Sequence, residues 1–417
     1  MGLTTKVLLG VILGAIIGMV FNQISTTTVG SWINYYLVDG AFYIIGQLFV
    51  NALKMLVVPI VFFSLICGVC AIGDIGILGR VGGKAFILYL LTTGLAISLA
   101  LLFAANMDIG QGLSLSVTSD FEGKASPPLS EVIIGLIPTN PLAAMVSGDM
   151  LPVIFFTILF GIGLLSVGQQ GKPLITVFES ANEVMMKVVL LVMQFAPYAV
   201  LVLVARSVAE LGFDLLLELA GYVIVLVLAL LLHLMGTLML ILVITTRLSP
   251  RVLLKKMRAT QLFAFSTASS NATIPVTLKA VTQQLGVNRG IASFTVPFGA
   301  TINMDGTAIM QGVATVFIAN LYGIELGMLG YLTVVMMSVL ASIGTAGVPG
   351  VGLIMLSMVF VQVGIPVEGI GLILGVDRLM DMLRTAVNVT GDAVVSVIVA
   401  DSEQQLNKAQ YYQSNSA

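Results

Sequence analysis

The chain has 417 residues, of which 58% are hydrophobic and only 9% charged, with a formal net charge of −2 and a mean hydropathy of +1.09. Soluble domains carry about 25% charged residues, so this composition excludes a soluble globular protein and indicates a polytopic membrane protein. The charge is not basic and the sequence has no strongly basic patch, which argues against binding to nucleic acid.

Apolar stretches follow one another along the whole chain, each bounded by polar or charged residues. Several are too long or too interrupted to be one simple span. They cover about 6–21, 40–72, 85–105, 130–167, 184–205, 219–246, 261–282, 290–320, 329–363 and 367–400. The first begins at Lys6 and lacks a small-residue cleavage site, so we interpret it as a retained helix and not as a signal peptide.

The positions of Lys and Arg predict the orientation of the chain. The cluster Arg247, Arg251, Lys255, Lys256 and Arg258 marks one connection as cytoplasmic. Alternating the spans from that connection places both termini in the cytoplasm and the loop at about 106–130 outside. We therefore expect a multi-pass protein of the cell inner (plasma) membrane.

Isolated reactive residues give weak signals. Cys67 and Cys70 form C-x-x-C inside an apolar stretch, where buried thiols are a better interpretation than a redox or metal site, because no further ligands are nearby. His233 is the only histidine. We expect a packed or helix-bonded imidazole there rather than a proton relay.

Two segments contain backbone that a plain helix cannot accommodate. Residues 265–275 and 342–352 are small and polar, and each carries a proline near its end. Such backbone is tolerated at membrane depth only where it is enclosed or lines a cavity. We interpret both as re-entrant hairpins; the alternative is two kinked helices that pack through small residues.

Each broken segment is followed by a span that carries polar residues, so the chain contains two copies of one plan. The first continues into the polar interruption 299–307 and the second into the segment 377–392. Paired broken segments in corresponding halves are typical of transporters with inverted repeats, whose substrate lies between the segments.

The segment 377–392 places polar side chains on one helix face within an otherwise apolar stretch. At about 100° per residue, five of them fall within an arc of about 80°. They are Asp377, Asp381, Arg384, Asn388 and Asp392, with Thr385 at the border. Each charged side chain costs about 2.5 to 3.5 kcal/mol at the centre of a membrane helix, so this stripe predicts a binding site.

At these residues the chain resembles the glutamate/aspartate transporter family, the dicarboxylate/amino acid:cation symporters. The resemblance covers essentially the whole chain. Four motifs occur in family order: the Ser-rich tip 266–271, Asn-Met-Asp-Gly-Thr at 303–307, Thr-Ala-Gly-Val-Pro-Gly at 345–350, and Asp-x-x-x-Asp-x-x-Arg-Thr-x-x-Asn-x-x-Gly-Asp at 377–392.

The resemblance implies an all-α polytopic protein with eight transmembrane helices and two re-entrant hairpins, assembled as a homotrimer and working by an elevator mechanism. Residues 1–75 would form scaffold helices 1 and 2, and 76–106 helix 3 of the transport domain. Residues 107–217 would form scaffold helices 4 and 5 with an extracellular loop. The transport-domain core would span 218–400, and we expect 401–417 to be a disordered tail.

The resemblance also implies a substrate site for L-aspartate or L-glutamate. Arg384 has a fork suited to the side-chain carboxylate, and Asp381 would take the α-ammonium. The implied substrate-binding residues are Ala268, Ser269, Ser270, Thr307, Val348, Asp381, Arg384, Thr385 and Asn388.

Sodium is the expected coupling ion, and the resemblance implies three cation sites. One comprises Gly299, Asn303, Asn388 and the Asp392 carboxylate. Another uses chain oxygens near Thr301, Met304, Ser342, Ile343 and Thr345. The third comprises Tyr89, Thr92, Thr93, Asn303 and Asp305.

Two departures from relatives matter. Gln311 stands where animal relatives carry a glutamate tied to proton cotransport and potassium countertransport, so we expect sodium coupling without potassium dependence. Relatives carry an arginine at one of two positions that are Ala268 and Met382 here. Arg378, three residues before Asp381, is our hypothesis for the missing charge; the alternative is a side chain reaching the membrane interface or Asp377.

Other functions have distinct requirements. A proton-coupled symporter for acidic amino acids or C4-dicarboxylates is the main alternative, although a C4-dicarboxylate has no use for an ammonium-binding Asp381. An anion channel needs no paired hairpins. An intramembrane hydrolase would use Ser269 or Ser270 as nucleophile, but the one histidine lies in a different span, so we expect no enzyme.

Overall fold

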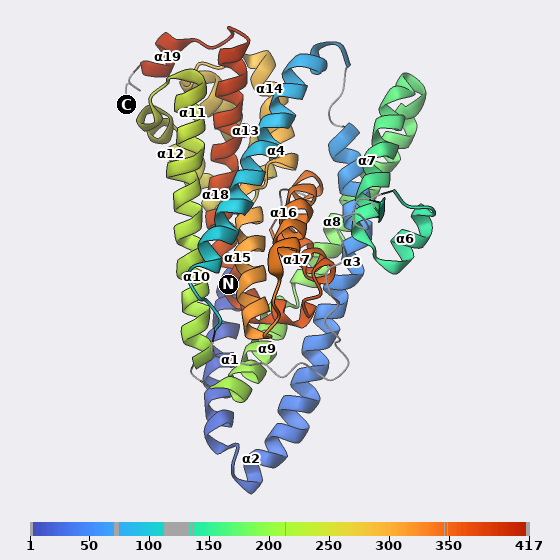
Figure 1. The fold of residues 1–417 in the computed structure, drawn as a ribbon, viewed down its shortest axis with the longest axis vertical. Coiled ribbons are helices and arrows are strands. Elements are labelled where there is room, and N and C mark those ends of the chain that lie inside the picture. The colour runs from blue at the N-terminus through green and yellow to red at the C-terminus, as the bar shows by residue number, and fades with distance from the viewer. Residues whose placement is uncertain are drawn as a thin grey trace.

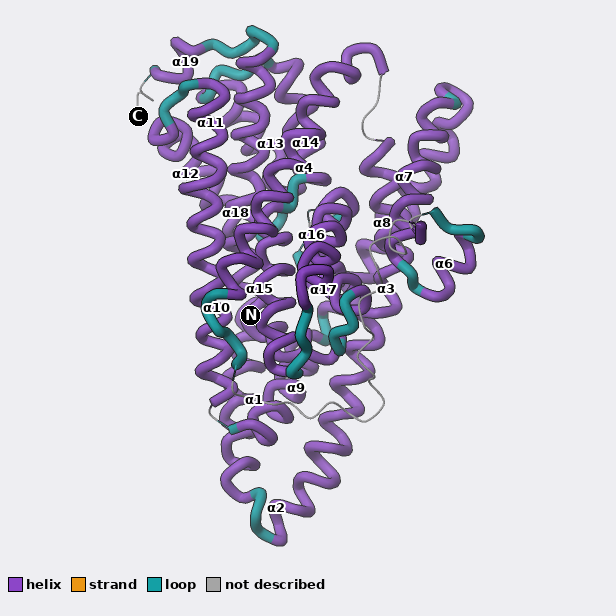
Figure 2. The backbone as a smooth tube through the Cα atoms, in the orientation of Figure 1, coloured by secondary structure: helices purple, strands orange, loops and turns teal. Residues whose placement is uncertain are grey.

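The computed structural model describes residues 3–70, 75–111, 134–135, 137–212, 214–345, 347 and 349–413. These residues are mostly helical. The β-pairing among them is a single isolated antiparallel bridge between Val287 and Leu406. Figure 2 shows the helices running along the long axis of the molecule. The predicted all-α class is confirmed.

The N-terminal helix α1 (Leu3–Ile24) packs along α9 (Ala196–Leu211). Gly10, Gly14 and Gly18 recur every four residues on the face of α1 that meets α9. A Cβ atom at each would come within 2.6 Å of a backbone carbonyl oxygen of α9. The missing side chains thus let the two backbones approach closely, as in other membrane helix pairs.

After α1, the chain forms α2 (Thr28–Ile33), the π-helical η1 (Asn34–Phe42) and α3 (Tyr43–Cys70). Helix α3 packs with a peripheral group of later helices. The group comprises α6 (Pro141–Ser147), α7 (Met150–Ser166), η2 (Gly168–Gly171) and α8 (Lys172–Met193). Figure 1 shows α3, α6, α7 and α8 beside the main bundle. Cys67 and Cys70 are free thiols in α3, and Cys70 is buried against α7.

The main bundle surrounds α15 (Asp305–Leu321), which packs against α4 (Ile75–Ala105) and α18 (Ile370–Ser402). A second long unit comprises α10 (Asp214–Leu232), the π-helical η3 (His233–Leu238) and α11 (Met239–Thr246). Helix α14 (Arg289–Ile302) precedes α15 and is separated from it by Asn303 and Met304. The bundle therefore places the polar residues of α14, α15 and α18 side by side.

Both predicted broken segments reverse the chain. In the first, α12 (Pro250–Thr267) is followed by α13 (Ser270–Lys279) and the π-helical η4 (Ala280–Gln284). In the second, α16 (Gly327–Gly344) is followed by α17 (Val351–Gln362) and the short η5 (Val367–Gly369). The two arms of each unit pack against one another, which the halves of a single kinked span would not do.

Fewer helices than eight meet the length and hydropathy of a membrane span among the described residues. Four do so alone: Thr28–Cys67, Arg80–Ala105, Leu215–Thr246 and Val367–Ser402. A bent pair, Gly168–Val192 with Ala196–Glu210, would make a fifth. Other expected spans are divided or short here, such as α14 with α15 and the apolar helix Pro152–Ser166, so the number eight stays a prediction.

The expectation of a disordered tail at 401–417 is wrong for the described part of that tail. Helix α18 continues to Ser402, and α19 (Lys408–Tyr412) folds back over the start of α12. Tyr411 is fully buried and its hydroxyl donates to the Ser249 carbonyl. An aromatic side chain with a hydrogen-bonded tip supplies burial that the polar composition of this segment does not reveal.

Candidate functional site

The tips of the two hairpins touch one another. Ala268 ends α12 in the left-handed conformation with φ of 48°, and Ser269 caps α13. The Ser269 hydroxyl donates to the Gly347 carbonyl at 2.7 Å, and the backbone N–H of Asn271 donates to the same oxygen at 3.1 Å. The strained turn and the glycine thus let one hairpin close directly on the other.

Arg384 lies at the centre of the charged group on α18. Its guanidinium is fully buried, and Nη2 pairs with Asp377 Oδ1 at 2.8 Å and Asp381 Oδ1 at 2.9 Å. Its Nε and Nη1 have no hydrogen-bond partner among the described residues. Since an arginine cannot be deprotonated in a protein, these buried donors demand an acceptor.

Asp381 has further partners on its other carboxylate oxygen. Oδ2 accepts the Gly350 amide of the second hairpin at 3.3 Å and lies 3.9 Å from Arg378 Nη1. Arg378 therefore reaches Asp381 from the preceding turn, as the charge-replacement hypothesis requires. Asp381 joins the charged face of α18 to the second hairpin.

Most of the predicted substrate residues line one cavity. Its lining comprises Ala268, Ser270, Met304, Thr307, Thr345, Gly347, Gly352, Asp381, Thr385 and Asn388. The cavity has a volume of about 10 Å³, which is near the lower limit for a single water molecule. Val348, also predicted to bind substrate, lies outside the described residues, and Ser269 lies at the adjoining tip contact.

A second polar group lies where α14 gives way to α15. The Asn303 amide donates to the Asp392 Oδ1 carboxylate oxygen at 2.8 Å and to the Asn388 carbonyl at 3.1 Å. A Cβ atom at Gly299 would lie 2.4 Å from Asp392 Oδ1 and 2.6 Å from the Tyr89 hydroxyl oxygen. Glycine at this position is thus what leaves room for oxygen atoms from two other helices, α4 and α18.

Asp305 anchors the neighbouring group. Its Oδ1 accepts the Thr93 hydroxyl at 2.7 Å and lies 3.3 Å from the Thr92 hydroxyl, while Oδ2 lies 3.1 Å from His233 Nε2. All four side chains are fully buried. Tyr89 sits one turn before Thr92 and Thr93, and its hydroxyl donates to the Thr295 carbonyl.

The charge balance of these two groups is unusual. In the described part of the chain, neither Asp305 nor Asp392 forms an ion pair with a lysine or arginine, although both are essentially fully buried. A buried carboxylate without a cationic partner is costly. Together with the hydroxyl, amide and carbonyl oxygens around them, these carboxylates form surroundings suited to a hard cation.

The remaining predicted cation ligands lie at helix ends near the tips. Thr301 closes α14, while Ser342 and Ile343 lie in the last turn of α16. Met304 and Thr345 line the cavity already described. A Cβ atom at Gly347 would lie 2.7 Å from the Ala300 carbonyl oxygen, so the second tip rests against the end of α14.

Three contributors were missing from the predicted substrate and cation residues. Asp377 belonged to the predicted polar stripe but was given no role, although its spacing of seven residues from Arg384 was a usable signal. Gly347 could not be recognised from its side chain, because it contributes through its backbone carbonyl, which accepts the Ser269 hydroxyl. His233, expected to pack or to bond its own helix, bonds Asp305 across the bundle, which no sequence pattern relates to it.

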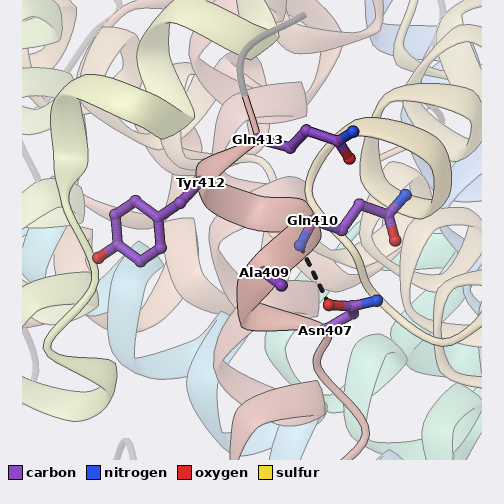
Figure 3. A pocket seen from close by; sticks show the side chains of 5 residues that line it. All are labelled: Asn407, Ala409, Gln410, Tyr412 and Gln413. Atoms are coloured by element: carbon purple, nitrogen blue, oxygen red, sulfur yellow. Dashed lines mark hydrogen bonds between the residues drawn. The ribbon is translucent and has the colours of Figure 1, made fainter.

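Another hollow lies elsewhere, at the surface over α19. It is lined by Asn407, Ala409, Gln410, Tyr412 and Gln413, which Figure 3 shows from close by. Its lining carries no charged side chain, and the Asn407 side chain is already engaged by the Gln410 amide at 3.0 Å. This hollow does not have the charges that an acidic amino acid would need.

A membrane-embedded bundle with two broken helical hairpins meeting over buried, oppositely charged groups defines the chain as a membrane transporter. Residues 3–402 match the model of the sodium:dicarboxylate symporter family, and the chain belongs to that family. The predicted resemblance is thereby confirmed, and members of this family are transporters, not enzymes.

Similar proteins come from several bacteria. The chain is 36% identical to the proton/glutamate-aspartate symporter of Escherichia coli (strain K12), over 97% of this chain and 94% of that protein. It is 33% identical to the proton/sodium-glutamate symport protein of Bacillus caldotenax, over 98% and 96%. It is also 32% identical to the C4-dicarboxylate transport protein of Bacillus subtilis (strain 168), over 98% and 95%.

Proposed function

We propose that this protein takes up L-aspartate or L-glutamate across the cell membrane by symport with sodium ions. The observation that carries the proposal is the state of Arg384. Two carboxylates pair with its Nη2, while Nε and Nη1 are buried and have no hydrogen-bond partner among the described residues. A side-chain carboxylate is the group that would satisfy those donors.

The rest of the amino acid finds complementary groups in the small cavity next to Arg384, whose lining includes Gly352; a Cβ atom at Gly352 would lie 3.5 Å from Arg384 Nη1. Asp381 lies beside Arg384 and would accept the α-ammonium, while Ser270, Thr307 and the first tip would hold the α-carboxylate. Thr385 and Asn388 lie on the same face of α18 as Arg384. The side-chain carboxylate, the α-ammonium and the α-carboxylate of the substrate would thus each have a partner: Arg384, Asp381, and Ser270 with Thr307.

Substrate entry requires the hairpin tips to separate. A cavity of about 10 Å³ cannot hold an amino acid. The hydrogen bonds from Ser269 and Asn271 to the Gly347 carbonyl hold the tips together. Opening the site therefore breaks both bonds, and closing it around substrate restores them.

Sodium supplies the driving force in this proposal, because Asp305 and Asp392 are buried acids without a cationic lysine or arginine in the described residues. Three sodium ions moving with one net-negative substrate would carry two positive charges, worth about 4.6 kcal/mol per 100 mV. That alone supports roughly a thousandfold accumulation. Gln311, a buried neutral amide, cannot carry a proton in the cycle.

The remaining parts of the proposal concern assembly and movement. We propose a homotrimer with both termini in the cytoplasm. In each protomer the bundle of α4, α10–α18 would move as one body past a scaffold that contains α1, α3 and α7–α9. The division follows the packing, because α15, α18 and both hairpins share contacts around the site.

Uptake of radiolabelled aspartate and glutamate into proteoliposomes tests the function. An inward sodium gradient without a proton gradient should drive accumulation, and external potassium or its absence should make no difference. Accumulation driven by a proton gradient alone would favour a proton symporter. Inhibition of aspartate uptake by succinate as strong as that by unlabelled aspartate would show that Asp381 does not read an ammonium group.

A further inference from the structure

His233 makes a polar contact that the proposed transport cycle has not used. It lies at the start of η3, a π-helical turn inserted between α10 and α11. Such turns are rare and occur often at functional sites. The side chain is fully buried, and Nε2 lies 3.1 Å from Asp305 Oδ2 on another helix.

The roles of the two atoms follow from their chemistry. Asp305 already accepts the Thr93 hydroxyl through Oδ1, so the group behaves as a carboxylate that accepts hydrogen bonds. The hydrogen in the His233 contact therefore sits on Nε2, whether the ring carries one proton or two. His233 Nδ1 has no partner among the described residues, so the ring is held through Nε2.

The two oxygens of Asp305 have different kinds of donor. The donor at Oδ1 is the Thr93 hydroxyl, and the Thr92 hydroxyl shares its one hydrogen between Oδ1 at 3.3 Å and the Tyr89 carbonyl at 3.1 Å. Both hydroxyls can also act as acceptors when their hydrogen turns away. The donor at Oδ2 is an imidazole N–H, which cannot reverse without a change of tautomer. Oδ1 can exchange its partners for a cation, whereas Oδ2 keeps its partner.

A cation that arrives beside Asp305 would remove the hydroxyl donors from Oδ1, because Thr92 and Thr93 would turn their lone pairs toward the ion. After that exchange, the His233 N–H would be the remaining donor to this carboxylate in the described part of the chain. Its contribution therefore increases when the ion binds. Ligands of bound metals are commonly held in this way by a hydrogen bond on their far side.

We propose that His233 is a positioning residue of this cation site: its Nε2–H fixes Asp305 through Oδ2, so that Oδ1 faces the ion together with Thr92 and Thr93. The proposal rests on sodium symport as the function. It predicts that His233 acts on sodium affinity without touching the ion or the amino acid.

The experiment measures sodium binding without the amino acid, through the rise of Tm of purified protein as NaCl replaces choline chloride at constant ionic strength. His233→Leu removes the donor, and His233→Phe does so while keeping a ring. His233→Gln keeps an N–H donor of similar reach. Leu234→Ala, at the neighbouring mostly buried position, is the control for lost packing.

We define the sodium midpoint as the NaCl concentration that raises Tm by one fixed amount, half of the rise that the wild type shows over the titration, because the rise continues with the logarithm of the concentration. This midpoint should increase about 10-fold or more in His233→Leu and His233→Phe, because a hydrogen bond to a charged group is lost. His233→Gln should stay within about threefold of the wild type. Leu234→Ala should lower Tm at every sodium concentration and leave the midpoint in place. The sodium dependence of aspartate binding should shift in parallel.

Two results would overturn the positioning role alone while the wild type responds to sodium. One is an unchanged midpoint in both donor-free variants. The other is a midpoint in His233→Gln that moves as far as in His233→Leu, which would assign the effect to ring shape. A wild type whose Tm and uptake both ignore sodium would instead overturn sodium symport, and this role with it.

Discussion

The charged group around Arg384 and the group around Asp305 and Asp392 share helix α18 but have opposite charge balances. On α18, a buried guanidinium is neutralised by Asp377 and Asp381 at 2.8 and 2.9 Å, and two of its nitrogen atoms still have no acceptor in the part of the chain that the structure describes. At the α14–α15 break, two buried carboxylates have hydroxyl, amide and imidazole partners but no lysine or arginine in the described residues.

The difference teaches which ligand each group is prepared to receive. The Arg384 group lacks acceptors, so an anion completes it. The Asp305 and Asp392 group lacks positive charge, so a cation completes it. Asn388 connects the two, because its side chain accepts the Gly306 amide at 2.8 Å while its carbonyl accepts the Asn303 amide. Binding at one group can therefore affect the other.

The largest expected effect comes from Arg384→Gln, which removes the anion-receiving charge. Aspartate affinity measured by calorimetry in saturating NaCl should fall at least about 30-fold, because one partner of a buried charge pair is lost. Arg206→Gln is the matched control. Arg206 lies on α9, away from the site, and pairs with Asp39 on η1 and with Glu210 on α9.

If Arg384→Gln kept wild-type aspartate affinity, the claim that the Arg384 group receives an anion would be wrong. Tm in the absence of ligand separates loss of recognition from loss of fold, because Asp377 and Asp381 lose their common partner in this variant. A protein that unfolds cooperatively and yet does not bind aspartate supports the assignment.

A smaller and different effect is expected for Asp392→Asn, which keeps the shape of the side chain and removes one charge. The sodium concentration for half-maximal aspartate binding should rise about 10-fold or more, since a hard cation loses an anionic ligand. At saturating sodium, aspartate affinity should recover, which it should not do in Arg384→Gln. Asp401→Asn is the control, because Asp401 lies at the C-terminal end of α18 and pairs with the half-exposed Lys408 at the start of α19.

If Asp392→Asn lost aspartate affinity at every sodium concentration, the two groups would not be separate receivers of anion and cation. The distinction drawn between them would then have to be replaced by a single shared site.

The smallest effect is expected at the predicted cytoplasmic end. Glu403 lies 2.7 Å from Lys84 and from Arg80, and the hydrogen bond from Lys84, with the charge of Arg80, lowers the pKa of Glu403 below its ordinary value. A lowered pKa stabilises the fold above the unfolded pKa of about 4.3, and this contribution is lost as the pH falls through the folded pKa.

Glu403→Gln should therefore lower Tm at pH 7 by no more than about 2 °C, and the difference from the wild type should vanish in acid. Sodium and aspartate midpoints should not move, because Glu403 is remote from both groups. Glu325→Gln, at an exposed position after α15, is the control. A shifted aspartate midpoint in Glu403→Gln would show that this end of α18 takes part in binding.

Much of the site could be predicted because hydrocarbon makes polar residues conspicuous. The stripe from Asp377 to Asp392 was recognisable on one helix face, and α18 carries all of its members buried. The two broken segments were recognisable from small residues and proline, and both reverse the chain. In these places local chemistry and the membrane leave few alternatives.

Long-range contacts could not be predicted in the same way. No local rule relates His233 to Asp305, which is 72 residues away, or Ser269 to the Gly347 carbonyl, which is 78 residues away. The tail was misjudged for the same reason. Polar residues at 401–413 indicated disorder, yet Tyr411 is buried and the Lys256 ammonium donates to the Gln410 carbonyl at 2.9 Å.

Composition and periodicity were enough to predict a helical membrane protein with a charged stripe on one helix, because the cost of a buried charge restricts where it can lie along a single helix. The packing of helices decided which oxygen of Asp305 faces which donor, how the two hairpin tips meet, and that residues 408–412 form a helix against the start of α12. Those features depend on atoms brought together from distant segments, whose distances are set only when the whole bundle has formed.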